Sequence, residues 1–235
     1  MRTRDDIFTQ VLVRNNRTTT DSFITDTNLK AWWKDATTWA NSYHKWPFLE
    51  VRDQSTSFSV EEIPYSNFSV KFKSDSIRFL QIGGKRVDKV NFTDYQILRE
   101  ETPEATRRVF SDWGRVVYVN PNIDLSGTVT AWGQYQPTID VTDETATTLF
   151  TDYDEEGNEA IVEKMQSYLK RREHLPDEAE LHDQRAVAKL EEIWKRVQDE
   201  QHVYQTTPER GGMYKRIDVV NGGLNDELFH RDRFE

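Results

Sequence analysis

Residues 25–49 read TDTNLKAWWKDATTWANSYHKWPFL, a tryptophan-rich helical pattern followed by a stop signal. Apolar side chains recur there at alternating steps of three and four residues, which places them on one face of a helix. That face consists of Leu29, Trp32, Ala36, Trp39 and Tyr43, and Trp33 widens it. Thr25 or Asp26 can cap the start, and Pro47 ends the helix because it lacks a backbone N–H. We expect this helix to pack inside its own domain.

The composition indicates a folded core that carries polar extensions. The chain has 235 residues, 36% of them hydrophobic, with a mean hydropathy of -0.82. Seven tryptophans and twelve phenylalanines argue against disorder. The formal net charge of -10 excludes simple adhesion to nucleic acid through a basic surface, because phosphate binding requires clustered Lys and Arg.

Several classes of site and segment are disfavoured by what the chain lacks. It contains no cysteine, so disulfides, thiolate nucleophiles and cysteine metal sites are excluded. No run of about 18 apolar residues occurs, and no apolar stretch follows the N-terminal residues, so we expect neither a membrane span nor a signal peptide.

The hydrophobic period changes along the chain from helical to alternating and back. We predict a short helix over residues 5–15 and then the aromatic helix. Strands are predicted at residues 57–60, 68–72, 77–82, 85–90, 94–99, 107–110, 115–119 and 128–132. Gly83-Gly84 predicts a tight hairpin, and Asp112-Trp113-Gly114 predicts a turn. Many short strands with short connections favour a small antiparallel sheet or sandwich.

Two helices are predicted after the strands, separated by Leu175-Pro176-Asp177. The apolar stripe of the first contains Ala160, Ile161, Met165, Tyr168 and Leu169, and that of the second contains Val187, Leu190, Trp194, Val197 and Tyr204. Joined by a short loop, they form an antiparallel hairpin with wide polar faces. The last 28 residues cannot build a core of their own, so they either fray or form an extended arm that adds to another chain, and the strand-like run at their centre favours the arm.

These elements predict an α+β fold: a helical bundle of N-terminal helices and a long C-terminal helical hairpin, with a small inserted antiparallel β domain and an extended C-terminal arm. The predicted domains are N-terminal helices at 1–50, the β domain at 51–138, the helical hairpin at 139–207, packed with 1–50, and the arm at 208–235.

One acidic segment has the spacing of a calcium-binding loop. Asp152, Asp154, Glu156 and Glu163 fall at its first, third, fifth and twelfth positions, and Gly157 at its sixth. Position five is a longer Glu, however, and position eight is Glu159 instead of an aliphatic residue. The alternative, which we favour, is the acidic first turn of a helix, where carboxylates meet the helix dipole.

Other motifs give little support to catalysis. Gly83-Gly84-Lys85 lacks the preceding glycine and the following Ser or Thr of a phosphate-binding loop. His44, His174, His182, His202 and His230 do not fall at a zinc-type spacing. Ser111 and Ser126 lie in turns without a nucleophile-elbow pattern. We therefore expect no enzyme, no catalytic residue, no resident metal and no cofactor.

Five segments follow one another along the chain: WPFLE at 46–50, SIRFL at 76–80, RVVYVNP at 115–121, GTVTAWG at 127–133, and the helix at 159–173. In this order they resemble the head-to-tail adaptor, or connector, proteins of tailed bacteriophages, which sit beneath the portal. The resemblance covers about the whole chain, and its motifs are loose and architectural. The second C-terminal helix and the terminal arm are longer here than in the family pattern.

The resemblance implies a structural virion protein of the neck or tail that is present in host cytoplasm during assembly. It implies a homo-oligomeric ring, a dodecamer in the virion, that docks on the portal protein, binds a downstream tail or nozzle protein and lets double-stranded DNA pass without sequence-specific binding. Portal-binding residues are expected in the arm, namely Met213, Tyr214, Ile217, Val219 and Val220, and Trp194 and Tyr204 are expected on a subunit-interface helix. Intrachain packing is the alternative for those two aromatics.

An acidic channel lining would repel phosphates and so let the genome slide. The alternative function is a virion-associated carbohydrate-binding or peptidoglycan-cleaving protein, with exposed tryptophans as sugar platforms. A third possibility is a calcium-binding adhesion module.

Overall fold

A computed structural model describes residues 2–18 and 24–206, except for the side chains of residues 199–206. The chain divides into two compact units. The first unit combines Met1–Ala36 with Asp143–Glu235, and the second is the continuous segment Thr37–Thr142. The boundary after Ala36 falls inside a helix.

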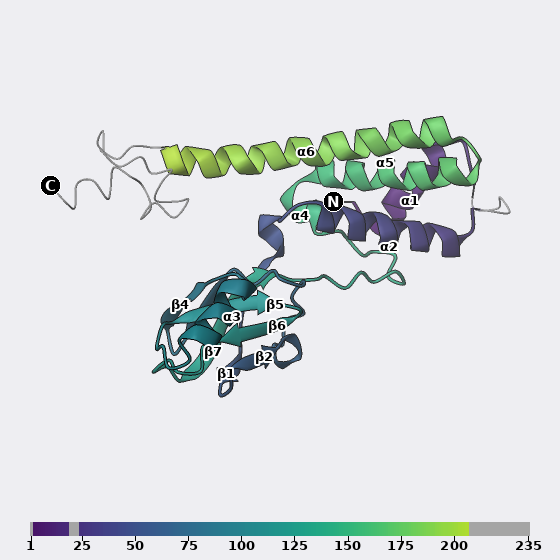
Figure 1. Cartoon of the computed structure of the whole chain (residues 1–235). Helices are drawn as coiled ribbons and strands as arrows, with labels where there is room; N and C mark the ends of the chain where they lie inside the picture. The colour runs from purple at the N-terminus through teal and green to yellow at the C-terminus, as the bar shows by residue number, and fades with distance from the viewer. Residues whose placement is uncertain (1, 19–23, 207–235) are drawn as a thin grey trace. The chain divides into compact units, whose positions relative to one another are not determined.

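The first unit is helical (Figure 1). It contains α1 (Arg4–Arg14), the first part of α2 (Asp26–Tyr43), α4 (Phe150–Tyr153), α5 (Glu155–Arg172) and α6 (Pro176–Thr206). A capping box between Thr3 and Asp6 starts α1, and Asp154 caps α5 by accepting from the amide of Glu156 at 3.0 Å. Helix α5 packs against α1, α4 and α6. The predicted pair of C-terminal helices with Pro176 at the start of the second is confirmed.

The buried face of α2 is rotated from the predicted one. Leu29, Trp33, Ala36 and Ala40 are buried, whereas Trp32, Trp39 and Tyr43 are only half-buried. Leu29 and Ala36 of the predicted face are buried, and Trp33, which was predicted only to widen that face, is the fully buried tryptophan of the helix. Thr25 begins the helix, with its hydroxyl accepting from the amide of Asn28 at 3.3 Å.

The second unit is built on a mixed seven-stranded sheet that curls into a nearly closed barrel. Its strands are β1 (Glu50–Phe58), β2 (Glu62–Pro64), β3 (Phe79–Ile82), β4 (Lys85–Lys89), β5 (Val109–Trp113), β6 (Val116–Val119) and β7 (Gly127–Gln134). They lie in the order β1-β7-β3-β4-β5-β6-β2. The core of this unit includes Phe72, Ile77, Leu80, Phe110, Val117 and Val129, all with no exposed area.

The predicted fold class is wrong, because the β part is not a small antiparallel insert in a helical bundle. Residues predicted as the strand 94–99 form instead the helix α3 (Phe92–Glu101). The Asn91 side chain caps it by accepting from the amide of Asp94 at 2.7 Å. Helix α3 connects β4 to β5, which are parallel neighbours. A parallel pair needs such a crossover, so this helix is what makes the sheet mixed.

Of the other local predictions in this unit, one is confirmed and one is wrong. The hairpin at Gly83-Gly84 is confirmed, since both glycines have positive φ and β3 pairs with β4. Residues 68–72 do not form a strand, but follow a short 3-10 helix, Tyr65–Asn67. A second 3-10 helix, Pro47–Leu49, follows α2 and leads into β1. Among the described residues, no helix is both long and apolar enough to cross a bilayer.

Candidate assembly surface

Helix α5 is the centre of an ion-pair network in the helical unit. The Glu159 carboxylate accepts hydrogen bonds from Arg14 at 2.9 Å, from Gln10 at 3.1 Å and from Arg2. Burial alone would raise the pKa of Glu159, but the hydrogen bonds from Arg14, Arg2 and Gln10 outweigh it and lower the pKa to about 2. This carboxylate therefore ties the N-terminal segment and α1 to α5.

A second, more deeply buried carboxylate extends the network to α6. Glu163 is 7% exposed; it accepts from Arg14 at 3.1 Å and lies 2.8 Å from the Nδ1 atom of His182 on α6. At the next residue of each helix, Asp183 of α6 accepts from Lys164 of α5 at 2.8 Å. The charged side chains between these helices are thus paired inward and fix the three helices to one another.

The end of α6 extends past the start of α5 (Figure 1). Arg196 of α6 lies 3.2 Å from Asp154, the N-cap of α5, and also pairs with Glu156 in its first turn. Helix α6 continues for ten more residues to Thr206, or roughly 15 Å at 1.5 Å per residue. This end of α6 lies beyond the helix against which the rest of α6 packs.

The acidic residues with the spacing of a calcium loop make separate contacts in the structure. Asp154 is the helix cap, Glu156 pairs with Arg196, and Glu163 lies between Arg14 and His182. Asp152 is exposed on α4. Within the part of the chain that the structure describes, no group of three acidic or histidine side chains is placed to hold a metal ion.

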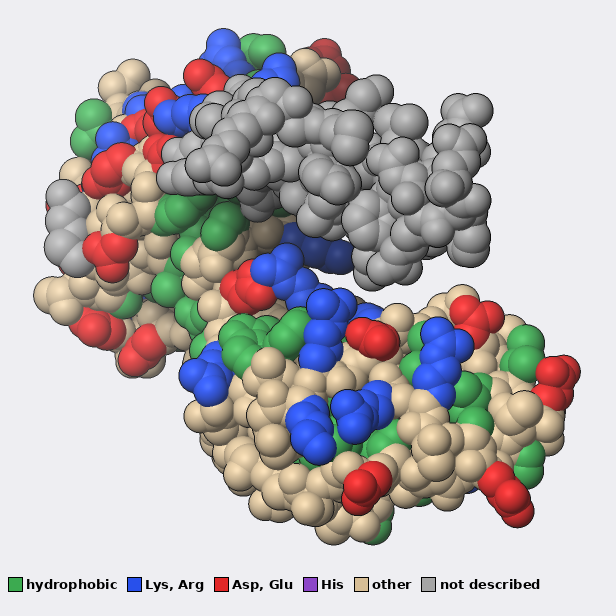
Figure 2. Space-filling model, turned by 90° about the vertical axis from the view of Figure 1, so that its left-hand side faces the viewer, with side chains coloured by type: hydrophobic (Ala, Val, Ile, Leu, Met, Phe, Trp, Pro, Cys, Tyr) green, Lys and Arg blue, Asp and Glu red, His purple; other side chains and the backbone are tan. Residues whose placement is uncertain are grey.

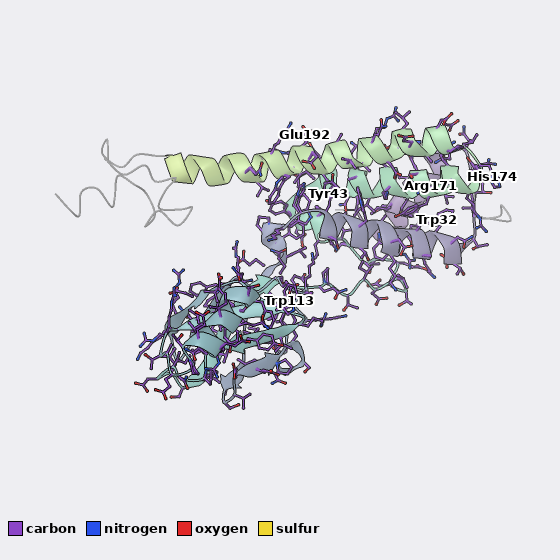
Figure 3. The ribbon with its side chains drawn as sticks, viewed as in Figure 1. Trp32, Tyr43, Trp113, Arg171, His174 and Glu192 are labelled. Atoms are coloured by element: carbon purple, nitrogen blue, oxygen red, sulfur yellow. The ribbon has the colours of Figure 1, made fainter. Side chains whose placement is uncertain are left out.

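The predicted interaction residues are only partly within the described chain. Trp194 lies on α6 and is half-buried. Tyr204 belongs to α6, but its side chain lies outside the described residues, as do Met213, Tyr214, Ile217, Val219 and Val220 of the arm. Figure 3 labels four side chains of the helical unit, namely Trp32, Arg171, His174 and Glu192.

Two carboxylates that the sequence analysis did not single out organise the β-rich unit. Asp53 accepts four hydrogen bonds of 2.6–2.7 Å, from the amide and hydroxyl of Ser55, the hydroxyl of Ser69 and the amide of Val70. Burial alone would raise the pKa of Asp53, but these hydrogen bonds outweigh it and lower that pKa. Asp53 therefore ties β1 to the segment 69–70, which runs along this edge of the barrel.

Asp112 is the second such group, and its side chain has no exposed area. It accepts from the Tyr65 hydroxyl at 2.6 Å and the Ile77 amide at 2.8 Å, and the Lys89 ammonium lies 3.7 Å away. Burial raises the pKa of Asp112 despite these partners. Neither Asp53 nor Asp112 carries a sequence motif, because their partners lie up to 47 residues away.

The net charge is divided unequally between the units. The segments of the first unit contain 19 Lys and Arg against 28 Asp and Glu, a net charge of -9, whereas the second contains 12 against 13, a net charge of -1. On the face of the β-rich unit drawn in Figure 2, Lys and Arg side chains lie among hydrophobic ones. The acidity of the chain is thus a property of the helical unit.

No protein-family model matches this chain, and the search of the curated proteins gives no match.

Proposed function

We propose that this protein is a structural virion component, a head-to-tail adaptor that forms a ring under a portal, extends the DNA channel and presents a platform for the next tail component. The observation that carries the proposal is the end of α6, which continues roughly 15 Å past the start of α5. A helix end that continues past the helix beside it is suited to contact a neighbouring subunit or the portal.

The distribution of charge supports the same role. A net charge of -9 on the helical unit repels phosphates, so DNA passing that unit would slide without being held. A heterologous contact between identical subunits closes into a ring when its rotation closes. The inward-paired charges around α5 keep the unit rigid enough to repeat one contact around such a ring.

The ionisable groups with the strongest hydrogen bonding also favour a structural role over catalysis. Asp53 holds the edge of the barrel, Glu159 holds α1 on α5, and Asp112 holds Tyr65 and the backbone of Ile77. Each carboxylate is occupied by groups of its own unit, and none is presented to a substrate.

The test is reconstitution with portal particles of the phage that encodes this chain. The full chain and a version ending at residue 198 are mixed with portal, and attachment is scored by electron microscopy and by light scattering. We expect both to fold, as judged by circular dichroism, and only the full chain to form a ring on the portal. Full attachment by the shortened chain would refute the role of the α6 end.

A second deletion distinguishes the contribution of the arm to attachment from that of α6. A chain ending at residue 207 keeps all of α6 and lacks the predicted arm residues. If it also fails to attach, the arm is required; if it attaches, the contact is made by α6. Failure of the full chain to join portal particles under any of these conditions would overturn the adaptor proposal itself.

One observation favours the alternative of carbohydrate binding. Trp113 is 56% exposed, and its ring stacks on Phe92 at 5.7 Å and 7° (Figure 3). Such a flat aromatic surface can hold a sugar ring. Binding of the chain to purified cell walls that is lost in Trp113→Ala would support this function, and no binding by either protein would remove it.

A further inference from the structure

A pocket of about 340 Å³ opens on the β-rich unit. It lies where the 3-10 helix Tyr65–Asn67 and the following residues meet the β5–β6 turn. Its lining consists of Pro64, Tyr65, Ser66, Phe68, Ser69, Val70, Lys71 and Arg115. The volume is at the small end of the range of ligand sites in proteins.

Hydrogen bonds to neighbouring groups fix the residues that line the pocket. The Tyr65 hydroxyl donates to buried Asp112, and the Tyr65 amide donates to the Arg115 carbonyl at 3.0 Å. Asp53 fixes the Ser69 hydroxyl and the Val70 amide. The site is therefore formed before any ligand arrives, which reduces the entropy that binding must overcome.

The charged groups of the pocket are both cations. Lys71 and Arg115 are exposed, and among residues 2–18 and 24–198, whose side chains the structure describes, no carboxylate pairs with either. The Arg115 guanidinium lies over the Tyr65 ring, 5.5 Å from its centre. No acidic residue is among the lining side chains, although the chain as a whole is strongly acidic.

The backbone at Arg115 adds a second observation. Gly114 and Arg115 occupy the centre of the β5–β6 turn with φ values of 62° and 65°. A turn with two positive φ values favours Asn or Gly at both positions, so Arg115 is held in a conformation that a long side chain rarely adopts. Backbone strain of this kind is concentrated at binding and catalytic sites.

We propose that this pocket binds a carboxylate attached to an apolar body. Lys71 and Arg115 bind the carboxylate of the ligand by ion pairing, and the guanidinium of Arg115 is suited to a bidentate contact. The apolar part of the ligand packs against Phe68, Val70 and the Tyr65 ring. Such a ligand is either a free apolar acid or an acidic residue beside an apolar one in a protein partner, and the site does not depend on the adaptor role.

The test is a titration of the full chain followed by NMR amide shifts. Benzoate is the probe, and benzamide, of the same shape without the charge, is its control. We expect saturable shifts at Ser66, Val70 and Arg115 with benzoate, and at least about fivefold weaker binding of benzamide. Inorganic phosphate, which lacks the apolar body, is expected to bind more weakly than benzoate.

Matched variants locate the site. Arg115→Gln and Lys71→Gln are each expected to weaken benzoate binding about fivefold, whereas Lys85→Gln, which removes an exposed cation of the β3–β4 hairpin, leaves it unchanged. The melting temperature of each variant shows that it is folded. Equal binding of benzoate and benzamide, unchanged binding in Arg115→Gln, or no shift at these amides would each overturn the proposal.

A pair of capped dipeptides distinguishes the two sources of the carboxylate. Acetyl-Phe-Glu-amide and acetyl-Phe-Gln-amide differ only in the charge. If the acidic dipeptide binds at least as tightly as benzoate and the neutral one does not, the ligand belongs to a protein partner. If benzoate binds and neither dipeptide does, the ligand is a free acid.

Discussion

The two units of this protein use buried carboxylates in different ways. In the helical unit, Glu159 and Glu163 face arginine side chains from a distant part of the chain. In the β-rich unit, Asp53 and Asp112 face backbone amides and hydroxyl groups. The first arrangement joins whole helices through flexible side chains. The second holds the backbone itself, so it shapes a barrel edge and a pocket wall.

The largest expected effect is the loss of Asp53. Asp53→Ala removes the acceptor of four hydrogen bonds and leaves the amides of Ser55 and Val70 without it, so we expect a loss of about 3 kcal/mol in the free energy of unfolding. Urea titration measures the loss, and hydrogen exchange should place it in residues 37–142. Asp88→Ala, an exposed carboxylate on β4, is the control. A loss spread evenly over both units would contradict the local role of Asp53.

A steric change tests the helical unit without altering its charge. Gly157 lies in α5, where an added Cβ would be 2.1 Å from a ring carbon of Phe150, whose side chain is fully buried. Alanine has the better helix propensity, but displacing the ring costs more, so Gly157→Ala is expected to destabilise by about 2 kcal/mol. The exposed change Gln184→Ala on α6 should stay within about 0.5 kcal/mol. Equal stability of both variants would show that the ring moves freely.

The pH dependence of the helical unit should follow Glu159. The pKa of Glu159 is about 2 in the folded chain, below its ordinary value of 4.5, so the carboxylate stabilises the fold above pH 4.5. This stabilisation is lost as the pH falls from 4.5 towards 2. Glu159→Gln should cost about 1.5 kcal/mol at pH 7 and flatten the acid-induced loss of stability. Thermal unfolding at a series of pH values makes the comparison, and an unchanged acid profile would disprove the assignment.

The smallest effect is expected from loss of the exposed ion pairs of Arg196. Arg196 is half exposed and pairs with Asp154 and Glu156, so Arg196→Gln should cost less than about 1 kcal/mol, and the difference should shrink in 1 M salt. Hydrogen exchange at the first turn of α5 is the measurement. The hydrogen bonds of Asp53 are buried from ions and should show no such dependence on salt.

The helices and the β3–β4 hairpin could be predicted because their signals are local. The three-four spacing along α5 and α6, the Pro176 start and the Gly83-Gly84 turn each act within a few residues. Helix α3 was mistaken for a strand because Tyr95 and Ile97 alternate with polar residues, although Tyr95 and Leu98 also lie three residues apart on one helical face. The signal that could have identified it is the Asn91 cap with Asp94 three residues later.

The sheet order and the pocket could not be predicted in the same way. The parallel pairing of β4 with β5 follows from α3, and an error in one element changed the fold class of the unit. The pocket depends on Arg115 meeting the segment 64–71, about 50 residues earlier in the chain. The longest contacts of Asp53 and Asp112 span 17 and 47 residues. Such contacts have no local pattern, because only the folded backbone brings them together.

The insertion of residues 37–142 into the helical unit has a consequence for synthesis of the chain. Arg14 leaves the ribosome 149 residues before its partner Glu163, which at 5–20 residues per second is a delay of roughly 7 to 30 s. Helix α1 lacks its partner helix α5 during that time, while every strand of the barrel has already emerged. The nascent chain therefore exposes the apolar face of Ile7, Phe8 and Val11 to solvent or to a chaperone until α5 is made.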